Sequence, residues 1–342
     1  MIKLKGALIG CGFFASNHIL AWKEINNVEI IAVCDLNIKK ANLFKRKYKI
    51  KYAYDSITTM IKDLKFDFVD VVTTMETHLN ICKILSNYRI STSIQKPFSD
   101  TLVDAKKIVN LYKKNKTILM VHENFRWQTP IIKIKKLISS HKLGKPIYSK
   151  ISFRHSNPVG YINQPYLYKL KKYLILDVGI HLYDLSRFFM GNAKNLFTVN
   201  QNTNKKFKGE TNFTTLINHK DGGVSIVDAS ISSIKKPDRF AQTLISIECQ
   251  HGSIDLDYNY KITLHKKNKK IFYSAKPINY KWISKPWDQI QESVVNTHKH
   301  FIKCLINNRM PDTSGKDNLR SLEMVFASYD SVYSNKNIKL KL

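Results

Sequence analysis

The sequence predicts an α/β fold in two parts: an N-terminal doubly wound parallel sheet, and a C-terminal α/β domain with a large, mostly antiparallel, open sheet. A glycine-rich turn near the N-terminus separates a short apolar strand from a helix. Strands and helices then alternate up to about residue 122, and from about residue 147 apolar and polar residues alternate with the period of a strand. Because 342 residues are many for one core, we expect two domains, residues 1–122 and 123–342.

The glycine turn is the most informative motif of the first domain. Gly10 lets the chain turn sharply out of the strand at 5–9, and Gly12 lets the backbone approach a pyrophosphate. Ala15 is small enough for the following helix to pack closely on the sheet, and the N-terminus of that helix offers N–H groups to an anion. Asp35 ends the second apolar strand, where a carboxylate can accept hydrogen bonds from an adenosine ribose. Together these features predict a dinucleotide-binding Rossmann domain.

Asp35 also bears on the choice of cofactor. Its carboxylate would repel a 2′-phosphate on the ribose, which favours NAD over NADP. Lys39 and Lys40 are close to it in the sequence and weaken this preference, so NADP stays open as a second cofactor.

The same periodicities predict the other elements. In the first domain we expect strands at 5–9, 30–34, 68–73, 90–94 and 118–121, with helices at 18–23, 38–47, 78–85 and 102–114. In the second domain we expect strands at 147–154, 212–218, 224–230, 243–249, 253–258, 261–265 and 271–273. Helices at 130–140, 177–190, 290–307 and 316–331 accompany this sheet, and the last of them can pack back on the first domain.

The composition excludes several classes of protein. The net charge of +30 would suit a nucleic-acid-binding protein, but the lysines are spread over the whole chain and no known basic module is present. We therefore expect no specific nucleic-acid partner. No apolar run reaches the length of a membrane span, and glycines break the N-terminal apolar stretch, which argues against a secretory signal. The five cysteines are scattered without metal-ligand spacing, which indicates buried thiols in a reducing cytoplasm and no metal site.

Two short motifs carry candidate catalytic residues. Lys96, within Gln95-Lys96-Pro97, follows a strand of the first domain, and the carboxyl end of such a strand faces the ligand crevice. The alternative is a surface lysine beside an ordinary turn, and only the position favours a functional one. Asp177 and His181 are four residues apart and share one face of a helix, where a carboxylate can accompany a histidine that acts as a general base. A capping aspartate with a core histidine is equally consistent with that segment alone.

A third motif, residues 121–128, connects the two domains. Polar and aromatic side chains are concentrated there, and a domain junction is a preferred place for a ligand site. Arg126 can fork onto a carboxylate or sugar hydroxyls. With Arg154, His155 and the general basicity of the chain, it also leaves an anionic substrate open. The alternative is an interdomain packing hinge with Trp127 in the core, which fits Phe125 and Trp127 at least as well.

Taken together, these motifs resemble the Gfo/Idh/MocA oxidoreductases, the family of glucose–fructose oxidoreductase and inositol dehydrogenase. The resemblance extends over essentially the whole chain and includes the glycine turn with Asp35, residues 73–78, Gln95-Lys96-Pro97, Asp177 with His181, and residues 308–315 before the closing helix. Residues 122–128, 164–167 and 177–184 look most like those of the sugar dehydrogenases in the family.

The resemblance implies an NAD(P)-dependent oxidoreductase that transfers a hydride between nicotinamide and a carbinol or carbonyl of a sugar, polyol or cyclitol. It assigns catalysis to Lys96, Asp177 and His181. His181 would accept the proton, Lys96 would stabilise the developing alkoxide, and Asp177 would orient the substrate hydroxyl or the histidine. The same residues would bind the substrate together with Asn124 and Arg126. The cofactor-binding residues would be Gly10, Gly12, Phe13, Phe14, Asp35, Thr73, Thr74, His78, Gln95 and Lys96.

The resemblance further implies a small-molecule substrate and a homodimer or homotetramer joined through the open C-terminal sheet. One departure is Gln95, which stands where the family usually has glutamate, and which keeps the hydrogen bonds but loses the charge. Two other functions stay open: an enzyme for a phosphorylated or nucleotide-linked sugar, and a non-catalytic NAD(P)-sensing regulator. The presence of Lys96, Asp177 and His181 argues against the regulator, which needs no proton transfer.

Overall fold

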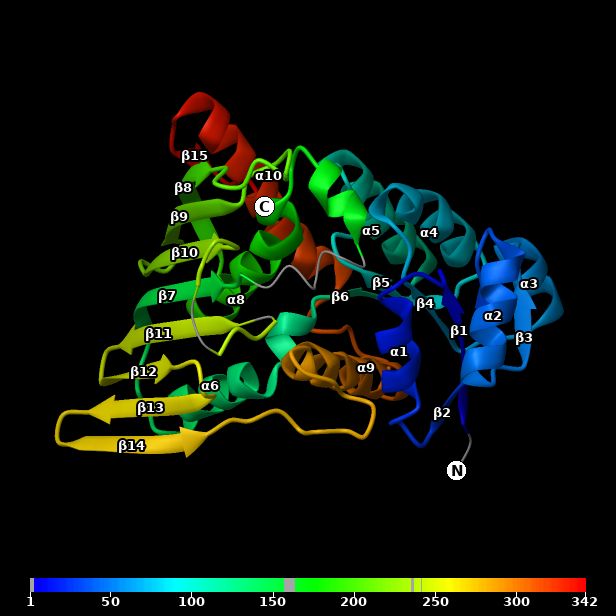
Figure 1. The fold of residues 1–342 in the computed structure, drawn as a ribbon, viewed down its shortest axis with the longest axis horizontal. Helices are drawn as coiled ribbons and strands as arrows, with labels where there is room; N and C mark the ends of the chain where they lie inside the picture. The colour runs from blue at the N-terminus through cyan, green and yellow to red at the C-terminus, as the bar shows by residue number, and fades with distance from the viewer. Residues whose placement is uncertain (1–2, 157–163, 235–236, 241) are drawn as a thin grey trace. The chain divides into compact units, whose positions relative to one another are not determined.

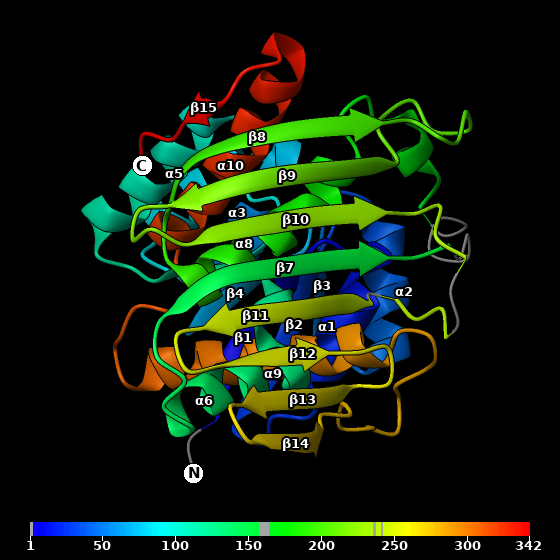
Figure 2. The same ribbon diagram turned by 90° about the vertical axis from the view of Figure 1, so that its left-hand side faces the viewer.

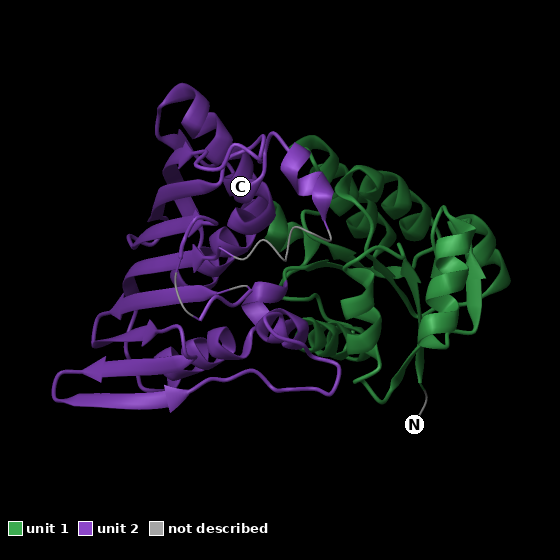
Figure 3. Ribbon diagram, in the orientation of Figure 1, with its two compact units in different colours: residues 1–123, 294–319 green, residues 124–293, 320–342 purple. Residues whose placement is uncertain are grey.

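The computed structural model describes residues 3–156, 164–234, 237–240 and 242–342. Contacts within the chain divide it into two compact units (Figure 3). Unit 1 comprises residues 1–123 and 294–319, and unit 2 comprises residues 124–293 and 320–342. By its contacts the segment 294–319 therefore belongs with unit 1. The division expected from the sequence, at residue 122, assigns this segment to the second domain.

Unit 1 contains a six-stranded parallel sheet in the order β3-β2-β1-β4-β5-β6 (Figure 1). Its strands are β1 (Leu4–Ile9), β2 (Val28–Cys34), β3 (Tyr52–Tyr54), β4 (Phe68–Val71), β5 (Ser91–Gln95) and β6 (Leu119–His122). The strand order reverses between β1 and β4, and a doubly wound sheet binds its ligand beyond the carboxyl ends of the strands at such a point. The predicted Rossmann topology is confirmed.

Helices cover both faces of this sheet, as a parallel sheet requires. α1 (Ala15–Trp22), α2 (Ile38–Tyr48) and α9 (Asp288–Ile306) share one buried apolar cluster with the sheet. The ring of Phe68 in β4 lies 4.8 Å from that of Trp22 and 5.7 Å from that of Phe301, so it joins α1 and α9 to the strand. Burying one such side chain contributes on the order of 1.5–3 kcal/mol. Of the remaining helices, α3 (Ile57–Asp63), α4 (His78–Asn87) and α5 (Leu102–Asn115), Figure 1 shows α4 and α5 on the opposite face of the sheet.

Unit 2 is built on a nine-stranded sheet in the order β14-β13-β12-β11-β7-β10-β9-β8-β15, which Figure 2 shows face on. Neighbouring strands within the described residues are antiparallel except β7 and β10, which are parallel. The strands are β7 (Pro146–Arg154), β8 (Ala193–Gln201), β9 (Asn212–His219), β10 (Val224–Ser230), β11 (Thr243–Cys249), β12 (Gly252–Leu256), β13 (Lys261–Lys266), β14 (Lys269–Ser274) and β15 (Ile338–Lys339).

Only one face of this sheet carries helices in the described part of the chain. α6 (Thr129–Ser140), α8 (Ile180–Met190) and α10 (Gly315–Ser334) lie on that face (Figure 1), and Figure 2 is drawn from the other. The strands alternate accordingly, because successive side chains point to opposite faces. In β9, for example, Phe213, Thr215 and Ile217 are buried, whereas Leu216 is 45% exposed.

The structure confirms the two predicted sheets and corrects several elements. β3 and β15 were not expected, because strands of three and two residues show no period. β8 and α3 were missed as well, and polar residues interrupt the apolar pattern of both. The helix expected at 177–190 is divided into a π-helical turn, η4 (Ile175–Gly179), and α8. The described residues contain no helix that is both long enough and apolar enough to span a membrane.

Candidate active site

The turn after β1 has the two properties that a pyrophosphate-binding turn needs. Gly10 has a φ of +96°, and a Cβ there would lie 2.6 Å from the carbonyl oxygen of Val72, so only glycine fits. At Gly12 an added Cβ would meet no heavy atom of the described residues within 4 Å, which leaves room for a ligand beside the backbone. α1 begins at Ala15, and the side chain of its N-cap residue, Phe14, makes no capping hydrogen bond. Phe14 therefore does not compete with an anion for the first N–H groups of the helix.

Asp35 ties the end of β2 to this turn. Its Oδ2 accepts a hydrogen bond from the backbone N–H of Cys11, and its Oδ1 accepts one from that of Asn37, both at 2.9 Å. Since a carboxylate offers about four acceptor sites, these two bonds leave capacity for ribose hydroxyls. Burial, assisted by the negative charge of Asp35, raises the pKa of Cys11 and Cys34 to about 12. Both thiols are therefore neutral at physiological pH.

These residues fit a dinucleotide. The turn has space at Gly12, α1 presents its N–H groups, and Asp35 ends the neighbouring strand, where a ribose binds in such folds. Phe13 is 39% exposed in the turn, and the ring of Phe14 packs edge-on to that of His18 at 5.4 Å, which supports the start of α1. The backbone of residues 10–15 and the Asp35 carboxylate would therefore hold the pyrophosphate and the adenosine ribose.

Thr73, Thr74 and His78 follow β4 at the same edge of the sheet. The hydroxyl of Thr77 donates to the carbonyl oxygen of Thr74 at 2.7 Å and lies 2.8 Å from Oγ1 of Thr73. His78 is buried, its Nε2 lies 3.2 Å from the carbonyl oxygen of Thr73, and burial lowers its pKa to about 4. The neutral imidazole therefore donates to that carbonyl and holds the turn. That these residues contact the cofactor stays a prediction.

Gln95 ends β5, and Lys96 follows it. The side-chain oxygen of Gln95 accepts from the backbone N–H of Lys96 at 2.8 Å, and its Nε2 lies 3.2 Å from Nε2 of His18 in α1. The Lys96–Pro97 peptide bond is cis. Because the strands of this sheet are parallel, the lysine leaves it at the same edge as the glycine turn, Asp35 and the threonines. The topology thus gathers the candidate residues of the first domain.

In unit 2 a buried carboxylate holds the segment that carries Asp177. Glu210 is 6% exposed, and its Oε1 accepts from the backbone N–H of Ile175 at 2.8 Å, from that of Tyr173 at 3.2 Å, and from the hydroxyl of Tyr329 at 2.7 Å. Burial and the Glu210 charge raise the pKa of Tyr329, so its hydroxyl remains a donor. These bonds fix the start of η4, the π-helical turn that contains Asp177, and such turns are frequent at functional sites.

His181 lies in the first turn of α8 and is 3% exposed. Its ring stacks on that of Phe125, with centroids 3.9 Å apart and an interplanar angle of 3°. Phe125 belongs to η2 (Asn124–Trp127), where the side-chain amide of Asn124 donates to Oγ of Ser293 at 2.8 Å. Phe125 is therefore a core residue that fixes the plane of the imidazole. Asp177 and His181 lie on one continuous helical segment, although its first turn is π-helical.

Arg126 is paired with a carboxylate. Its Nε lies 2.8 Å from Oδ2 of Asp184, and its Nη2 lies 2.5 Å from Oδ1, with the two side chains 8% and 0% exposed. Ser321 donates a further hydrogen bond to Asp184 at 3.2 Å. The bidentate interaction that was expected with substrate is thus made with the Asp184 carboxylate. Such a pair of parallel N–H to carboxylate bonds is strong and specific in its geometry. Substrate binding by Arg126 stays a prediction.

Comparison with known proteins agrees with both units. Residues 4–123 match an oxidoreductase family with an NAD-binding Rossmann fold, and residues 131–255 match the GFO/IDH/MocA C-terminal domain. The chain belongs to the GFO/IDH/MocA oxidoreductase family. It is an oxidoreductase with an NAD-binding Rossmann domain, as the glycine turn predicts.

Among its relatives the chain is similar to two D-apiose dehydrogenases. That of Rhizobium rhizogenes is 37% identical over 99% of this chain and 98% of its own, and that of Paraburkholderia graminis is 35% identical over 99% and 90%. An oxidoreductase from Agrobacterium radiobacter, solved with NAD+, L-tartaric acid and magnesium, is 37% identical and covers 98% of both chains with a TM-score of 0.96. The predicted resemblance to sugar dehydrogenases of the family is confirmed.

Gly10→Ala and Gly12→Ala form a matched pair of variants that tests the nucleotide site. Gly10→Ala should lower the free energy of unfolding by about 1–3 kcal/mol, because its positive φ and the Val72 carbonyl both oppose a side chain. Gly12→Ala should change that free energy by less than about 0.5 kcal/mol, yet weaken NADH binding about ten-fold, because its methyl group occupies the ligand space. Urea unfolding and titration of NADH fluorescence measure both quantities. Unchanged NADH affinity in Gly12→Ala would contradict the assignment.

Proposed function

We propose that this protein is an NAD-dependent dehydrogenase of a free sugar, with D-apiose as the first candidate substrate. The observation that carries the proposal is the similarity to two D-apiose dehydrogenases over nearly the whole chain. Lys96, Asp177 and His181, which the family resemblance marks as the proton-handling residues, are all present in the sequence. The five cysteines form no disulfide with one another, and four are buried, which supports a cytoplasmic enzyme.

Each of the three residues has a chemical task in this proposal. Bound NAD supplies the hydride acceptor. As the hydride leaves the carbinol carbon with its electron pair, the hydroxyl proton passes to a ring nitrogen of His181 and the carbinol becomes a carbonyl. The ammonium group of Lys96 stabilises the negative charge that develops on the oxygen, and Asp177 orients the hydroxyl. The stack on Phe125 supports this role of His181, because it fixes the plane in which the ring nitrogens lie.

The structure favours a neutral sugar over a phosphorylated or nucleotide-linked one. The general basicity of the chain and three residues, Arg126, Arg154 and His155, leave an anionic substrate open, but each of the three residues is paired with a carboxylate. Arg126 is forked onto Asp184, Arg154 is bonded to Asp228, and His155 Nδ1 lies 3.0 Å from Oδ1 of Asp238. Phosphate binding would have to break or share these pairs.

A substrate panel tests the proposal. We expect NADH formation, followed by absorbance, with D-apiose and NAD+ and much slower turnover with phosphorylated pentoses. Turnover confined to phosphorylated or nucleotide-linked sugars would contradict the proposal and establish the anionic alternative. NADH binding without turnover of any sugar or polyol would instead indicate the non-catalytic regulator.

Lys96→Ala and His181→Ala should bind NADH normally but lose about two to four orders of magnitude in kcat, as expected for the removal of an acid–base group. Lys107→Ala is a matched control, because this lysine lies on the surface of α5, 57% exposed, with Asp104 as its partner. Steady-state kinetics with D-apiose and fluorescence titration of NADH measure the two effects. Normal turnover in either candidate variant would remove that residue from the mechanism.

Asp35→Ala should narrow the preference for NAD over NADP by about ten-fold, the equivalent of about 1.4 kcal/mol, because the repulsion of the 2′-phosphate is lost. NAD affinity should also fall, since the carboxylate holds the backbone of Cys11 in the glycine turn. The ratio of kcat/KM for the two cofactors is the measurement. An unchanged ratio would show that Asp35 does not select the cofactor.

We also propose that the helix-free face of the unit 2 sheet joins subunits into a homodimer or homotetramer. The strand register places Leu216 between Phe197 in β8 and Ile226 in β10, so an apolar row crosses three strands of this face. Leu216→Lys should dissociate the oligomer, whereas Leu43→Lys, at a 58% exposed position in α2, should not. Light scattering during size-exclusion chromatography measures the mass, and an unchanged mass for Leu216→Lys would contradict this interface.

A further inference from the structure

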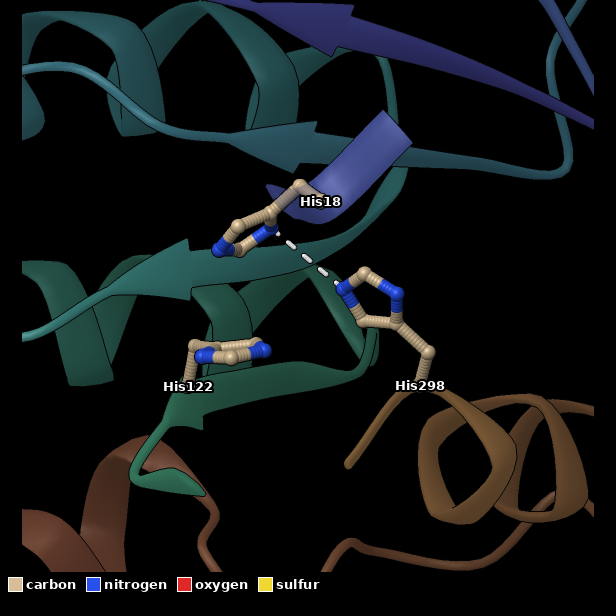
Figure 4. A group of neighbouring side chains, drawn as sticks. All are labelled: His18, His122 and His298. Carbon is tan, nitrogen blue, oxygen red and sulfur yellow. Dashed lines mark hydrogen bonds between the residues drawn. The ribbon is translucent and has the colours of Figure 1, made fainter. Parts of the chain in front are cut away.

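A fully buried group of polar side chains lies under the carboxyl edge of the unit 1 sheet. His18 from α1, Asp70 from β4 and His298 from α9 are each 0% exposed, as is His122 at the end of β6. Figure 4 shows the three imidazoles gathered around one point, with Nε2 of His298 3.3 Å from Nδ1 of His18 and 3.5 Å from Oδ2 of Asp70. Most buried polar atoms are hydrogen-bonded, and the bonds of His18 assign the donor and the acceptor among its two ring nitrogens.

The side chain of Gln95 fixes the proton positions. Its oxygen must be the atom that faces Lys96, because the backbone N–H of Lys96 can only donate. Its NH2 group therefore faces Nε2 of His18 at 3.2 Å, so Nε2 is the acceptor and the neutral ring carries its proton on Nδ1. That Nδ1–H donates to Oδ2 of Asp70 at 2.8 Å, where the indole N–H of Trp22 also donates at 2.7 Å.

This chain of bonds runs from a buried carboxylate to the backbone of the candidate catalytic lysine. We propose that His18 is a positioning residue for Lys96: anchored by Asp70, it holds the Gln95 amide so that the amide oxygen fixes the backbone N–H of Lys96. The proposal rests on the proposed role of Lys96 and deepens it. The proposal also explains why an amide suits position 95. The NH2 group of Gln95 can donate to Nε2 of His18, whereas a glutamate carboxylate can only accept hydrogen bonds.

The same three histidines invite comparison with a metal site, since their ring nitrogens lie within 4.8 Å of one another. Imidazole binds a metal ion through a lone pair, and the partner of the other ring nitrogen sets which nitrogen is available. In the tautomer set by Gln95 the His18 nitrogen that faces Asp70 and His298 carries a proton. His18 therefore acts as a hydrogen-bonding residue in this chain, and a metal bound at its Nδ1 would require the Gln95 amide to turn over and release Lys96.

Two substitutions of His18 separate its two bonds. The amide NH2 group of His18→Asn occupies the position of Nδ1 and can donate to Asp70, but nothing reaches Gln95. The side-chain oxygen of His18→Gln occupies the position of Nε2 and can accept from Gln95, but the donor to Asp70 is lost. We expect kcat with NAD+ and D-apiose to be about ten-fold higher in His18→Gln than in His18→Asn, because small displacements of a catalytic group reduce rate by such factors.

The free energy of unfolding should show the opposite order, because His18→Gln leaves the Asp70 carboxylate with one donor fewer. If His18 had only a structural role, the variant with the lower free energy of unfolding would also have the lower kcat. Equal kcat values for the two variants, or a kcat that follows stability, would overturn the proposal. NADH affinity, measured by fluorescence, should be the same in both variants.

A spectroscopic measurement tests the network without reference to turnover. In the wild-type protein labelled with 15N-histidine, we expect the His18 ring, assigned by comparison with His18→Gln, to carry its proton on Nδ1 and not on Nε2. An Nε2–H tautomer, or stoichiometric zinc bound to the purified protein, would overturn the proposal. Failure of the proposed function would look different: Lys96→Ala would turn over normally while the His18 tautomer remained as stated.

Discussion

The buried carboxylate of Asp70 is the constraint on which the first unit depends. A carboxylate with no solvent exposure needs hydrogen-bond donors, and α1 supplies two of them to Oδ2 of Asp70, the His18 imidazole and the Trp22 indole. The helix that presents its N-terminus to the pyrophosphate is thereby held against β4 by polar bonds as well as by packing. Through His18 and Gln95 the same carboxylate reaches the backbone of Lys96. Cofactor binding and the candidate catalytic lysine thus share one support.

Unit 2 uses a second buried carboxylate in a comparable way. Glu210 collects two backbone N–H groups and a tyrosine hydroxyl at the start of the π-helical turn that carries Asp177. One helical turn later, the stack on Phe125 fixes the ring of His181. In both units the candidate catalytic side chain is mounted on an irregular piece of backbone, a turn before proline or a π-helical turn. An acidic side chain far away in the sequence supports each of these segments.

The sequence was sufficient to predict the two sheets and the nucleotide site because the signals there are local. The glycine turn, the uncapped helix and Asp35 fall within one βαβ unit, and the strands alternate with their own period. The supports were not predictable, since Glu210 stands 37 residues from Tyr173, and His298 is 280 residues from His18. The π-helical turn could not be predicted from the sequence, because the four-residue spacing of Asp177 and His181 is also that of an ordinary α-helix. Arg126 was expected to face the substrate, and the fold shows that its guanidinium donates two hydrogen bonds to the Asp184 carboxylate.

The proposed mechanism requires Lys96 and His181 to act on the same carbinol of a sugar, with NAD as the hydride acceptor. A crystal structure of the complex with NAD+ and D-apiose tests this requirement most directly. We expect Nζ of Lys96 and one ring nitrogen of His181 both to lie within about 2.7–3.2 Å of a single sugar hydroxyl, whose carbon faces the nicotinamide. A complex in which the two side chains contact different hydroxyls, or in which the sugar binds away from either of them, would contradict it.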